Sequence, residues 1–242
     1  MYKDKFVSVV IAAAGMSNRM GSKVNKQFIL VGGKPILAHT IEKFEACDMV
    51  DEIVIAGKES EIDYINREIV KKYGLKKVSA IVRGGVERHH SVYNALLSLS
   101  EKSDIVLSHD GARPFVDIDT IERDIKAVYK TGAAIVGVPV KDTIKVVENY
   151  EVEDTPTREK LWQAQTPQGF DKNLLLEAYR DFMKKDLRAT DDAGIVEAYG
   201  KRVVMVRGSY ENIKITTPDD VILGEALMMY KEGSLPYREM SV

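Results

Sequence analysis

The sequence predicts an α/β protein, and two patterns carry this prediction. Short runs of β-branched and other apolar residues alternate along the chain with segments in which apolar residues recur every three or four positions. Repeated strand–helix units of this length form a mostly parallel sheet with helices on both faces. Between residues 139 and 165 the pattern changes to period two, which predicts a protruding β-hairpin arm. The expected architecture is therefore Rossmann-like with one added arm.

The strands are predicted from hydrophobic runs. Residues 7–12 form a continuous run rich in valine and isoleucine, which is typical of an inner parallel strand, and the run ends at a glycine turn. The other strands are expected at 51–57, 78–85, the beginning of 104–115, 133–140 and 202–208. Open α/β sheets bind ligands beyond the carboxyl ends of their strands. The residues that follow these runs are therefore the candidates for function.

Helices are predicted between the strands from apolar residues that share one face. After Pro35, which can open a helix, apolar residues recur at Leu37, Ile41 and Phe44. Comparable patterns predict helices at 62–73, from near Glu87, around 121–128, from about Lys172, at 191–199 and after Pro218. Helices that alternate with strands in this way are expected to cover both faces of the sheet.

Residues 140–165 interrupt this alternation. Apolar and polar residues alternate there on both sides of Asn149 and Tyr150, as in a hairpin, and no helix is expected in the segment. An isolated two-stranded hairpin is marginally stable in water, so the arm must pack against something. A second copy of the chain and the arm's own domain are both open as that partner. The chain is expected to be one domain, residues 1–242, with the arm at about 139–165.

The composition narrows the possible functions. Of the 242 residues, 45% are hydrophobic, enough for a substantial core, and the formal net charge of -2 gives no basic field for nucleic acid. The single cysteine, Cys47, excludes an internal disulfide framework, and the four histidines lack zinc-site spacing. The first apolar run is too short for a signal peptide or a membrane span. We therefore expect a cytoplasmic protein without nucleic-acid or membrane partners.

The glycine turn after the first strand is the first candidate site. It reads AAAGMSNRMGSKVNKQF at residues 12–28 and carries Arg19, Lys23 and Lys26. Its glycines have the wrong spacing for a P-loop and for a dinucleotide fingerprint, so a nicotinamide dehydrogenase is excluded. Backbone amides there can hold phosphate oxygens, while Arg19 and Lys26 can stabilise a charge that grows during reaction. Ordinary solvated surface cations are the alternative, but the pattern favours transfer at phosphorus.

Polar residues also follow the third and fourth strands. Gly84 precedes a helix start that carries Arg88 and Ser91, and glycine there admits a flat base close to the backbone. Asp110 follows a buried strand directly, with Arg113 three residues later. A carboxylate beside a phosphate site is a natural partner for magnesium, although a turn-capping aspartate is the alternative.

Sequence blocks spread over nearly the whole chain resemble one known family. They read AAAGMSNRMGSKVNKQF, GGVERHHSV, HDGARPF, PVKDTIK, QTPQGF, TDDAGIVEAYG and ENIKITTPDD. In this order and spacing they closely resemble the 2-C-methyl-D-erythritol 4-phosphate cytidylyltransferases of the non-mevalonate isoprenoid pathway. The resemblance implies a parallel sheet that binds CTP, a requirement for Mg²⁺ or another divalent cation, and a homodimer in which each arm hooks around the partner.

The resemblance also assigns site residues. The nucleotide would contact Ala13, Ala14, Gly15, Arg19, Lys26, Gly84, Arg88, Ser91 and Asp110. The polyol phosphate would contact Asp110, Arg113, Thr143, Arg158, Thr166, Thr190 and Lys214. Arg19 and Lys26 would stabilise the transition state, and Asp110 would bind the metal. Arg158 and Lys214 would aim the attacking phosphate. Because the arm would be exchanged, Thr143 and Arg158 would serve the partner's site.

The implied reaction transfers a cytidylyl group from CTP to 2-C-methyl-D-erythritol 4-phosphate, giving 4-diphosphocytidyl-2-C-methyl-D-erythritol and pyrophosphate. Two alternatives stay open: a ribitol-5-phosphate cytidylyltransferase and a non-catalytic CTP-binding protein. Three positions depart from the family's usual pattern, because Asn25 replaces a proline, Gly111 an alanine and Glu211 an aspartate. The role of Glu211, including a second magnesium contact, is therefore open.

Overall fold

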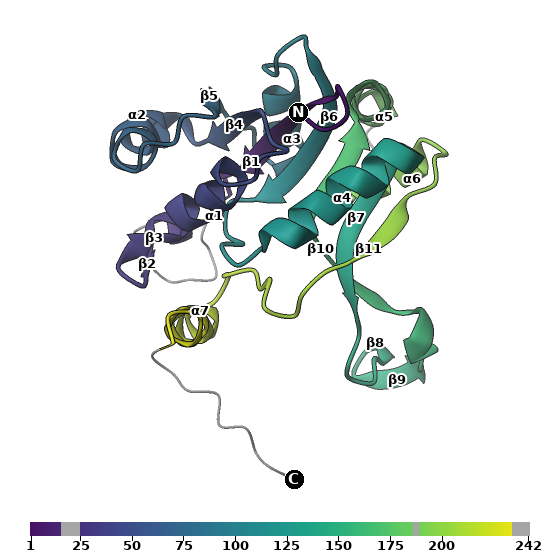
Figure 1. Ribbon diagram of the computed structural model, residues 1–242. Helices are drawn as coiled ribbons and strands as arrows, with labels where there is room; N and C mark the ends of the chain where they lie inside the picture. The colour runs from purple at the N-terminus through teal and green to yellow at the C-terminus, as the bar shows by residue number, and fades with distance from the viewer. Residues whose placement is uncertain (16–24, 186–188, 234–242) are drawn as a thin grey trace.

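The computed structural model describes residues 1–15, 25–185 and 189–233, and it is built around a seven-stranded sheet (Figure 1). The strand order is β11-β7-β10-β6-β1-β4-β5. Its strands are β1 (Phe6–Ala12), β4 (Glu52–Gly57), β5 (Val78–Arg83), β6 (Ser103–Asp110), β7 (Ala133–Pro139), β10 (Trp162–Asp171) and β11 (Val204–Arg207). All neighbouring pairs are parallel except those of β10, which runs antiparallel to β6 and β7. The predicted α/β class is confirmed.

Helices cover both faces of the sheet. They are α1 (Ile36–Glu45), α2 (Ile62–Tyr64) with the following π-helix η3 (Ile65–Lys71), α3 (Arg88–Leu96), α4 (Ile118–Thr131), α5 (Lys172–Lys185), α6 (Asp192–Ala198) and α7 (Pro218–Lys231). Val9 and Ile11 of β1 pack in one hydrophobic cluster with α1, η3 and α4. Val10 packs in a second cluster with α3, α5 and α6. Because successive side chains of a strand point to opposite faces, one apolar run supplies both layers.

The position of β1 creates the site. It pairs in parallel with β4 on one side and with β6 on the other, so the strands that follow β1 in the chain lie on both sides of it. Open α/β sheets bind ligands at such a switch point. Ala12 at the end of β1 lies opposite Ala56 of β4 and Asp110 of β6. The ends of β1, β4, β5 and β6 therefore form one edge, which we call the carboxyl edge.

Strand β10 was not predicted. Its burial follows no two-residue period, because Gln165, Thr166 and Gln168 are all buried. Hydrogen bonds with buried partners replace the missing apolar pattern, such as the one from the Asp110 amide to Thr166 Oγ1 at 3.1 Å. The arm was predicted at residues 139–165. Its last residues, from Trp162 onward, belong to strand β10 of the central sheet.

The arm itself contains the predicted hairpin, formed by β8 (Val146–Glu148) and β9 (Glu151–Asp154). Asn149 and Tyr150 at its tip have φ angles of 49° and 67°, as a two-residue type I′ turn requires. Every residue from 141 to 155 is exposed, and Figure 1 shows the hairpin extending away from the central sheet. The hairpin is confirmed, and its packing partner stays a prediction.

A small layer beside the carboxyl edge completes the fold. The short hairpin of β2 (Leu30–Val31) and β3 (Lys34–Pro35) packs with α7 through a cluster that includes Phe115 and Ile215. Helix α7 begins at Pro218, as the sequence predicts, and a capping box between Thr217 and Asp220 closes its first turn. In the part of the chain that the structure describes, no helix combines the length and apolar character that crossing a membrane needs.

Candidate active site

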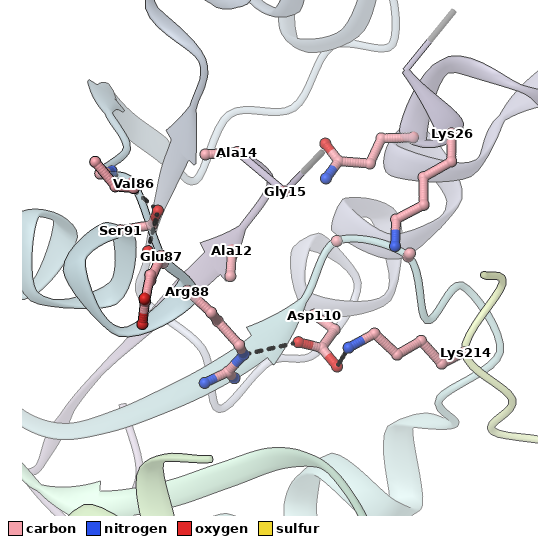
Figure 2. Close-up of a pocket in the computed structure, with 14 residues that line it drawn as sticks. Ala12, Ala14, Gly15, Lys26, Val86, Glu87, Arg88, Ser91, Asp110 and Lys214 are labelled. Atoms are coloured by element: carbon pink, nitrogen blue, oxygen red, sulfur yellow. Dashed lines mark hydrogen bonds and ion pairs between the residues drawn. The ribbon is translucent and has the colours of Figure 1, made fainter. Parts of the chain in front are cut away.

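Two adjoining cavities open at the carboxyl edge, and they share one wall. The first cavity, of about 220 Å³, is lined by Ala12, Ala14, Gly15, Lys26, Gln27, Gly85, Val86, Glu87, Arg88, Ser91, Asp110, Gly111, Ala112 and Lys214. The second, of about 240 Å³, is lined by Arg88, Asp110, Arg113, Ala164, Gln165, Thr166, Gln168, Thr190, Asp191 and Lys214. Arg88, Asp110 and Lys214 line both cavities and form the shared wall, which Figure 2 shows from the side of the first cavity.

Asp110 is the centre of this wall. Its Oδ1 accepts from Arg88 Nε at 3.1 Å, while Oδ2 lies 2.8 Å from Lys214 Nζ and 3.4 Å from Arg113 Nε. In Figure 2, Arg88 and Lys214 approach the carboxylate from opposite sides. Burial raises the pKa of Asp110, but the positive charges of Arg88, Lys214 and Arg113 lower it further, so the pKa lies well below its usual value. The carboxylate is therefore ionised, with cations on both oxygens.

Thr166 and His109 hold the backbone beneath Asp110. Thr166 Oγ1 accepts the Asp110 amide at 3.1 Å and donates to His109 Nδ1 at 3.0 Å. His109 Nε2 donates to the Arg113 carbonyl at 3.1 Å, because a carbonyl oxygen can only accept. Burial lowers the pKa of His109 to about 3, so its ring is neutral. Both ring nitrogens are thus used in holding the turn.

The turn after β1 closely approaches Gly84, which follows β5. Ala13 is buried and donates its amide to the Ala56 carbonyl at 2.8 Å, while Ala14 and Gly15 line the first cavity. A Cβ on Gly84 would lie 2.3 Å from the Ala14 Cβ, so only glycine fits there. Gly84 itself does not line the cavity but allows the neighbouring turn to do so.

Ser91 fixes the glycine turn that precedes α3. Its hydroxyl accepts the Gly85 amide at 3.0 Å and donates to the Glu87 carbonyl at 3.1 Å. This contact places the first turn of α3 against the first cavity, where Arg88 and Ser91 were both predicted.

Lys26 lies on the opposite side of the first cavity, at the start of the short helix η1 (Lys26–Phe28). Asn25 is the N-cap of η1, and its side-chain amide donates to both carboxylate oxygens of Glu61, at 3.1 and 2.9 Å. The asparagine that replaces the family's usual proline is therefore fixed by side-chain hydrogen bonds. Arg19, the other predicted transition-state residue, lies outside the described residues.

Lys214 is carried by the segment between β11 and α7, which is tied to the carboxyl edge. The side-chain amide of Asn212 donates to the backbone carbonyl of Thr166 at 2.9 Å, and Arg113 Nη1 donates to the backbone carbonyl of Asn212 at 2.8 Å. Glu211, whose role was open, instead forms a 2.8 Å ion pair with Lys231 and lines neither cavity.

The second cavity contains most of the residues predicted for the polyol phosphate. Asp110, Arg113, Thr166, Thr190 and Lys214 all line it. The two arm residues do not: Thr143 and Arg158 are exposed, and Arg158 Nη1 donates to the Lys141 carbonyl at 3.3 Å. Within one chain, the structure therefore does not bring the arm residues to the cavities.

Sequence reasoning missed Asp192, which lies behind the shared wall, and also Gln168 and Asp191, which line the second cavity. Asp192 is fully buried and accepts from Arg88 Nη1 at 2.9 Å, while Gln168 Nε2 donates to Asp191 at 2.8 Å. The two aspartates stand within the block TDDAGIVEAYG, but their pattern also fits an ordinary helix N-terminus. Only the hydrogen-bond partner of each carboxylate distinguishes a residue that supports the site from an ordinary helix cap.

The fold and the site together define a class of protein. An open, mostly parallel sheet whose switch point carries a glycine turn, several cations and one ionised carboxylate is suited to bind phosphates and stabilise charge at phosphorus. The two cavities on either side of that carboxylate provide room for two substrates. This is the arrangement of a nucleotidyltransferase.

Comparison with known proteins identifies the family. The family model described as IspD, 2-C-methyl-D-erythritol 4-phosphate cytidylyltransferase, matches residues 7–230. A relative of that name from Alkaliphilus oremlandii is 50% identical over 222 residues, covering 91% of this chain and 94% of the relative. One from Clostridioides difficile is 48% identical, covering 91% and 93%. The chain belongs to the 2-C-methyl-D-erythritol 4-phosphate cytidylyltransferase family, as the sequence resemblance indicated.

Solved structures agree with this assignment. The 4-diphosphocytidyl-2C-methyl-D-erythritol synthase of Anaerococcus prevotii superposes with a TM-score of 0.84 at 33% identity, covering 93% of this chain and 97% of that one. The 2-C-methyl-D-erythritol 4-phosphate cytidylyltransferase of Thermus thermophilus gives 0.77 at 35% identity, covering 92% and 98%. Fold and sequence therefore lead to the same family.

Proposed function

We propose that the chain transfers the cytidylyl group of CTP to 2-C-methyl-D-erythritol 4-phosphate, the reaction for which its family is named. An oxygen of the sugar phosphate attacks the α-phosphorus of CTP in line and forms the new P–O bond. The bond between the α-phosphorus and the bridging oxygen breaks, and its electron pair leaves on pyrophosphate. The products are 4-diphosphocytidyl-2-C-methyl-D-erythritol and pyrophosphate, so all atoms are accounted for.

The nucleophile needs no general base, because a phosphate monoester is already anionic near neutral pH. The barrier comes instead from bringing two anions together, so positioning and neutralisation of charge dominate catalysis. Lys214 is held at the wall between the cavities, where the attacking phosphate and the α-phosphate would meet. Lys26 lies on the nucleotide side of that wall. We assign transition-state stabilisation to Lys26 and Arg19, and orientation of the nucleophile to Lys214 and Arg158.

One observation supports this assignment above the others: the two cavities share Arg88, Asp110 and Lys214. CTP would occupy the first cavity, with its phosphates along the turn of Ala13, Ala14 and Gly15. Its base would lie toward Gly84, Arg88 and Ser91. The sugar phosphate would occupy the second cavity, with Arg113, Thr166 and Thr190 around it. The two reacting groups then meet at the shared wall.

The residues present fit a magnesium ion that is bound together with the substrates. Within the described residues, no group of three or more histidine, cysteine or acidic side chains could hold a metal. Mg²⁺ commonly uses one or two carboxylates together with substrate phosphates, and Asp110 is an ionised carboxylate at the wall of both cavities. Asp110 would hold the ion, which would neutralise charge on the phosphates. Another divalent cation with oxygen ligands would suit the same site.

We further propose that the chain works as a single domain within a homodimer. Thr143 and Arg158 are exposed on an arm that extends from the sheet, and the cations that line the second cavity are Arg88, Arg113 and Lys214. A second copy whose cavity received this arm would use both residues, and the exposed apolar side chains of the arm would be covered. A cytoplasmic location is consistent with a single, buried cysteine.

The test is the release of pyrophosphate from CTP with each candidate acceptor. We expect release with 2-C-methyl-D-erythritol 4-phosphate and Mg²⁺, little with ribitol 5-phosphate, and little without a divalent ion. Preferential use of ribitol 5-phosphate would assign the other acceptor. Binding of CTP without release with either acceptor would show a non-catalytic protein. A Lys26→Ala variant with unchanged turnover would remove the role assigned to Lys26.

A further inference from the structure

Asp192 is a buried carboxylate that lies behind the shared wall and lines neither cavity. It is the first residue of α6, and none of its side chain is exposed. Its Oδ2 accepts from Arg88 Nη1 at 2.9 Å, and its Oδ1 accepts from the Tyr179 hydroxyl of α5. A buried anion is tolerated when it is paired and hydrogen-bonded, and Asp192 meets both conditions.

The consequence for Arg88 is a fixed orientation. The planar guanidinium contacts Asp110 through Nε at 3.1 Å, Asp192 through Nη1 at 2.9 Å and the Ser108 hydroxyl through Nη2 at 3.4 Å. Because the nitrogens are held in a rigid fork, three partners in different directions fix the whole group. Without the charge of Asp192, the guanidinium is free to turn and pair bidentately with Asp110, the carboxylate that Lys214 also contacts.

Asp192 is in turn held by the sheet. Its amide donates to Gln168 Oε1 of β10 at 3.1 Å, and Gln168 Nε2 donates to Asp191 Oδ2 at 2.8 Å. Burial lowers the pKa of Arg88, but the charges of Asp192 and Asp110 raise it further, so Arg88 remains charged. The contact is therefore an ion pair with both partners fixed from behind.

We propose that Asp192, supported by Tyr179, is a positioning residue that holds the Arg88 guanidinium in the wall between the two cavities and so keeps Asp110 oriented toward Lys214. The inference rests on the proposed function, because it takes the wall as the place where the substrates meet. Loss of a residue that lines only one cavity is expected to affect only the substrate bound in that cavity. Asp192 acts on Arg88, which lines both cavities, so its loss affects both substrates.

The test is the Asp192→Asn variant, which keeps the size of the side chain and removes its charge. Losing a hydrogen bond between charged groups predicts a fall of about tenfold to hundredfold in kcat/KM for CTP and for the acceptor alike. The matched control is Glu52→Gln, the same change at a buried carboxylate hydrogen-bonded to Ser8 and Ser79 at the other edge of the sheet. That control is expected to change stability while leaving both kcat/KM values within about twofold.

A double-mutant cycle separates positioning from a structural role. In the Arg88→Met background, Asp192→Asn should lower kcat/KM by less than about threefold, because Arg88 is no longer there to be positioned. Equal effects in both backgrounds would overturn the proposal. If Asp192→Asn does not fold, Tyr179→Phe removes one hydrogen bond to Asp192 and should lower both kcat/KM values about twofold to tenfold. Unchanged values for folded Tyr179→Phe would also overturn it.

Failure of the proposed function is recognised separately. If the wild-type protein releases no pyrophosphate with either acceptor, the function fails and the variants are compared by calorimetric CTP binding instead. Asp192→Asn should then weaken CTP binding about tenfold or more, and Glu52→Gln should leave it unchanged. CTP binding that is equal in wild type and Asp192→Asn would overturn the positioning role on its own.

Discussion

The carboxyl edge of the sheet and the arm are proposed to contact the same sugar phosphate, yet they differ in how their side chains are held. At the edge, the side chains of Asp110 and Arg113 are 10% and 13% exposed and are ion-paired with each other. On the arm, Arg158 is exposed and donates one hydrogen bond to a backbone carbonyl. The edge holds its charges in place before a substrate arrives, whereas the arm leaves them in water.

This difference has a physical reason. Charges can be buried at the edge because Asp110 meets three cations, and Asp192 behind it meets Arg88 and the Tyr179 hydroxyl. The hairpin has only its own two strands and lacks a core that would cover such groups. The side chains at the edge are already held in place by contacts within their own chain. A solvated side chain on the arm becomes ordered only when another surface covers it. The comparison supports the proposal that the edge carries catalysis and that a second copy completes the site.

The largest expected effect is at the edge. Lys214→Met removes the charge that lies 2.8 Å from Asp110, and loss of one preorganised donor should lower kcat about a hundred- to a thousandfold, or about 3–4 kcal/mol in the barrier. Steady-state kinetics of pyrophosphate release measure it. The matched control on the arm is Lys145→Met, whose ammonium contacts Thr155 at 2.7 Å and which should change kcat less than about twofold. Similar effects of the two changes would abolish the distinction between edge and arm.

A smaller effect is expected from Arg158→Ala on the arm. Loss of a charged hydrogen bond to the sugar phosphate predicts a fall of about tenfold to hundredfold in kcat/KM for the acceptor, with little change for CTP binding. Mixing this variant with Lys26→Ala tests whether the arm is exchanged. In an exchanged dimer, about a quarter of the sites recover both side chains, and activity rises to about that fraction. If activity did not recover after subunit exchange, Arg158 would not act in the site of the partner chain.

Asp124 is a buried carboxyl group away from the carboxyl edge. It shows what burial does to a carboxyl group that lacks the cations and hydrogen-bond donors found at the edge. Asp124 of α4 is buried, and neither of its oxygens has a hydrogen-bond partner among the described residues. Burial raises its pKa well above the usual value, so the folded state retains a proton that the unfolded state loses above about pH 4. Folding is therefore weakened as the pH rises from about 4 toward neutrality.

Asp124→Asn removes this pH dependence. Between pH 4 and pH 7 the free energy of unfolding of the variant should improve relative to wild type by at least about 1.4 kcal/mol, since one pKa unit corresponds to that value. Urea unfolding at both pH values measures the difference, and comparing the two pH values cancels the effect of burying a neutral amide. If the free energy of unfolding changed equally in variant and wild type between the two pH values, Asp124 would ionise normally in the folded protein.

The smallest effect is expected from Val152→Thr on the arm. Val152 is 60% exposed, so the free energy of unfolding of the monomer should change by less than about 0.5 kcal/mol. The same change at Val106 of β6, which is fully buried, should lower it by about 1–3 kcal/mol because a hydroxyl enters an apolar layer. Denaturant unfolding of both variants at low concentration checks the contrast. A large loss from Val152→Thr would show that the arm already packs against its own chain.

The sequence by itself determined the layers, the parallel strands and the candidate edge. Val9, Val10 and Ile11 predict an inner strand because the side chains alternate between two apolar faces, and the hairpin turn at Asn149 and Tyr150 follows from residues that are neighbours in the chain. Asp110 could be identified for a similar reason, since it stands at the end of a buried strand. In each case the physical cause is local, so the signal is local too.

Only the tertiary structure decided the rest. Strand β10 is buried through polar contacts with residues far away in the chain, such as Thr166 with His109, so no periodic pattern shows it. Asp192 meets Arg88, which precedes it by 104 positions, and a helix-starting aspartate has the same sequence signature whether or not it holds a cation. Hydrophobic periodicity records which face of an element is covered. It does not record which partner a buried charge meets, because that depends on how distant segments pack.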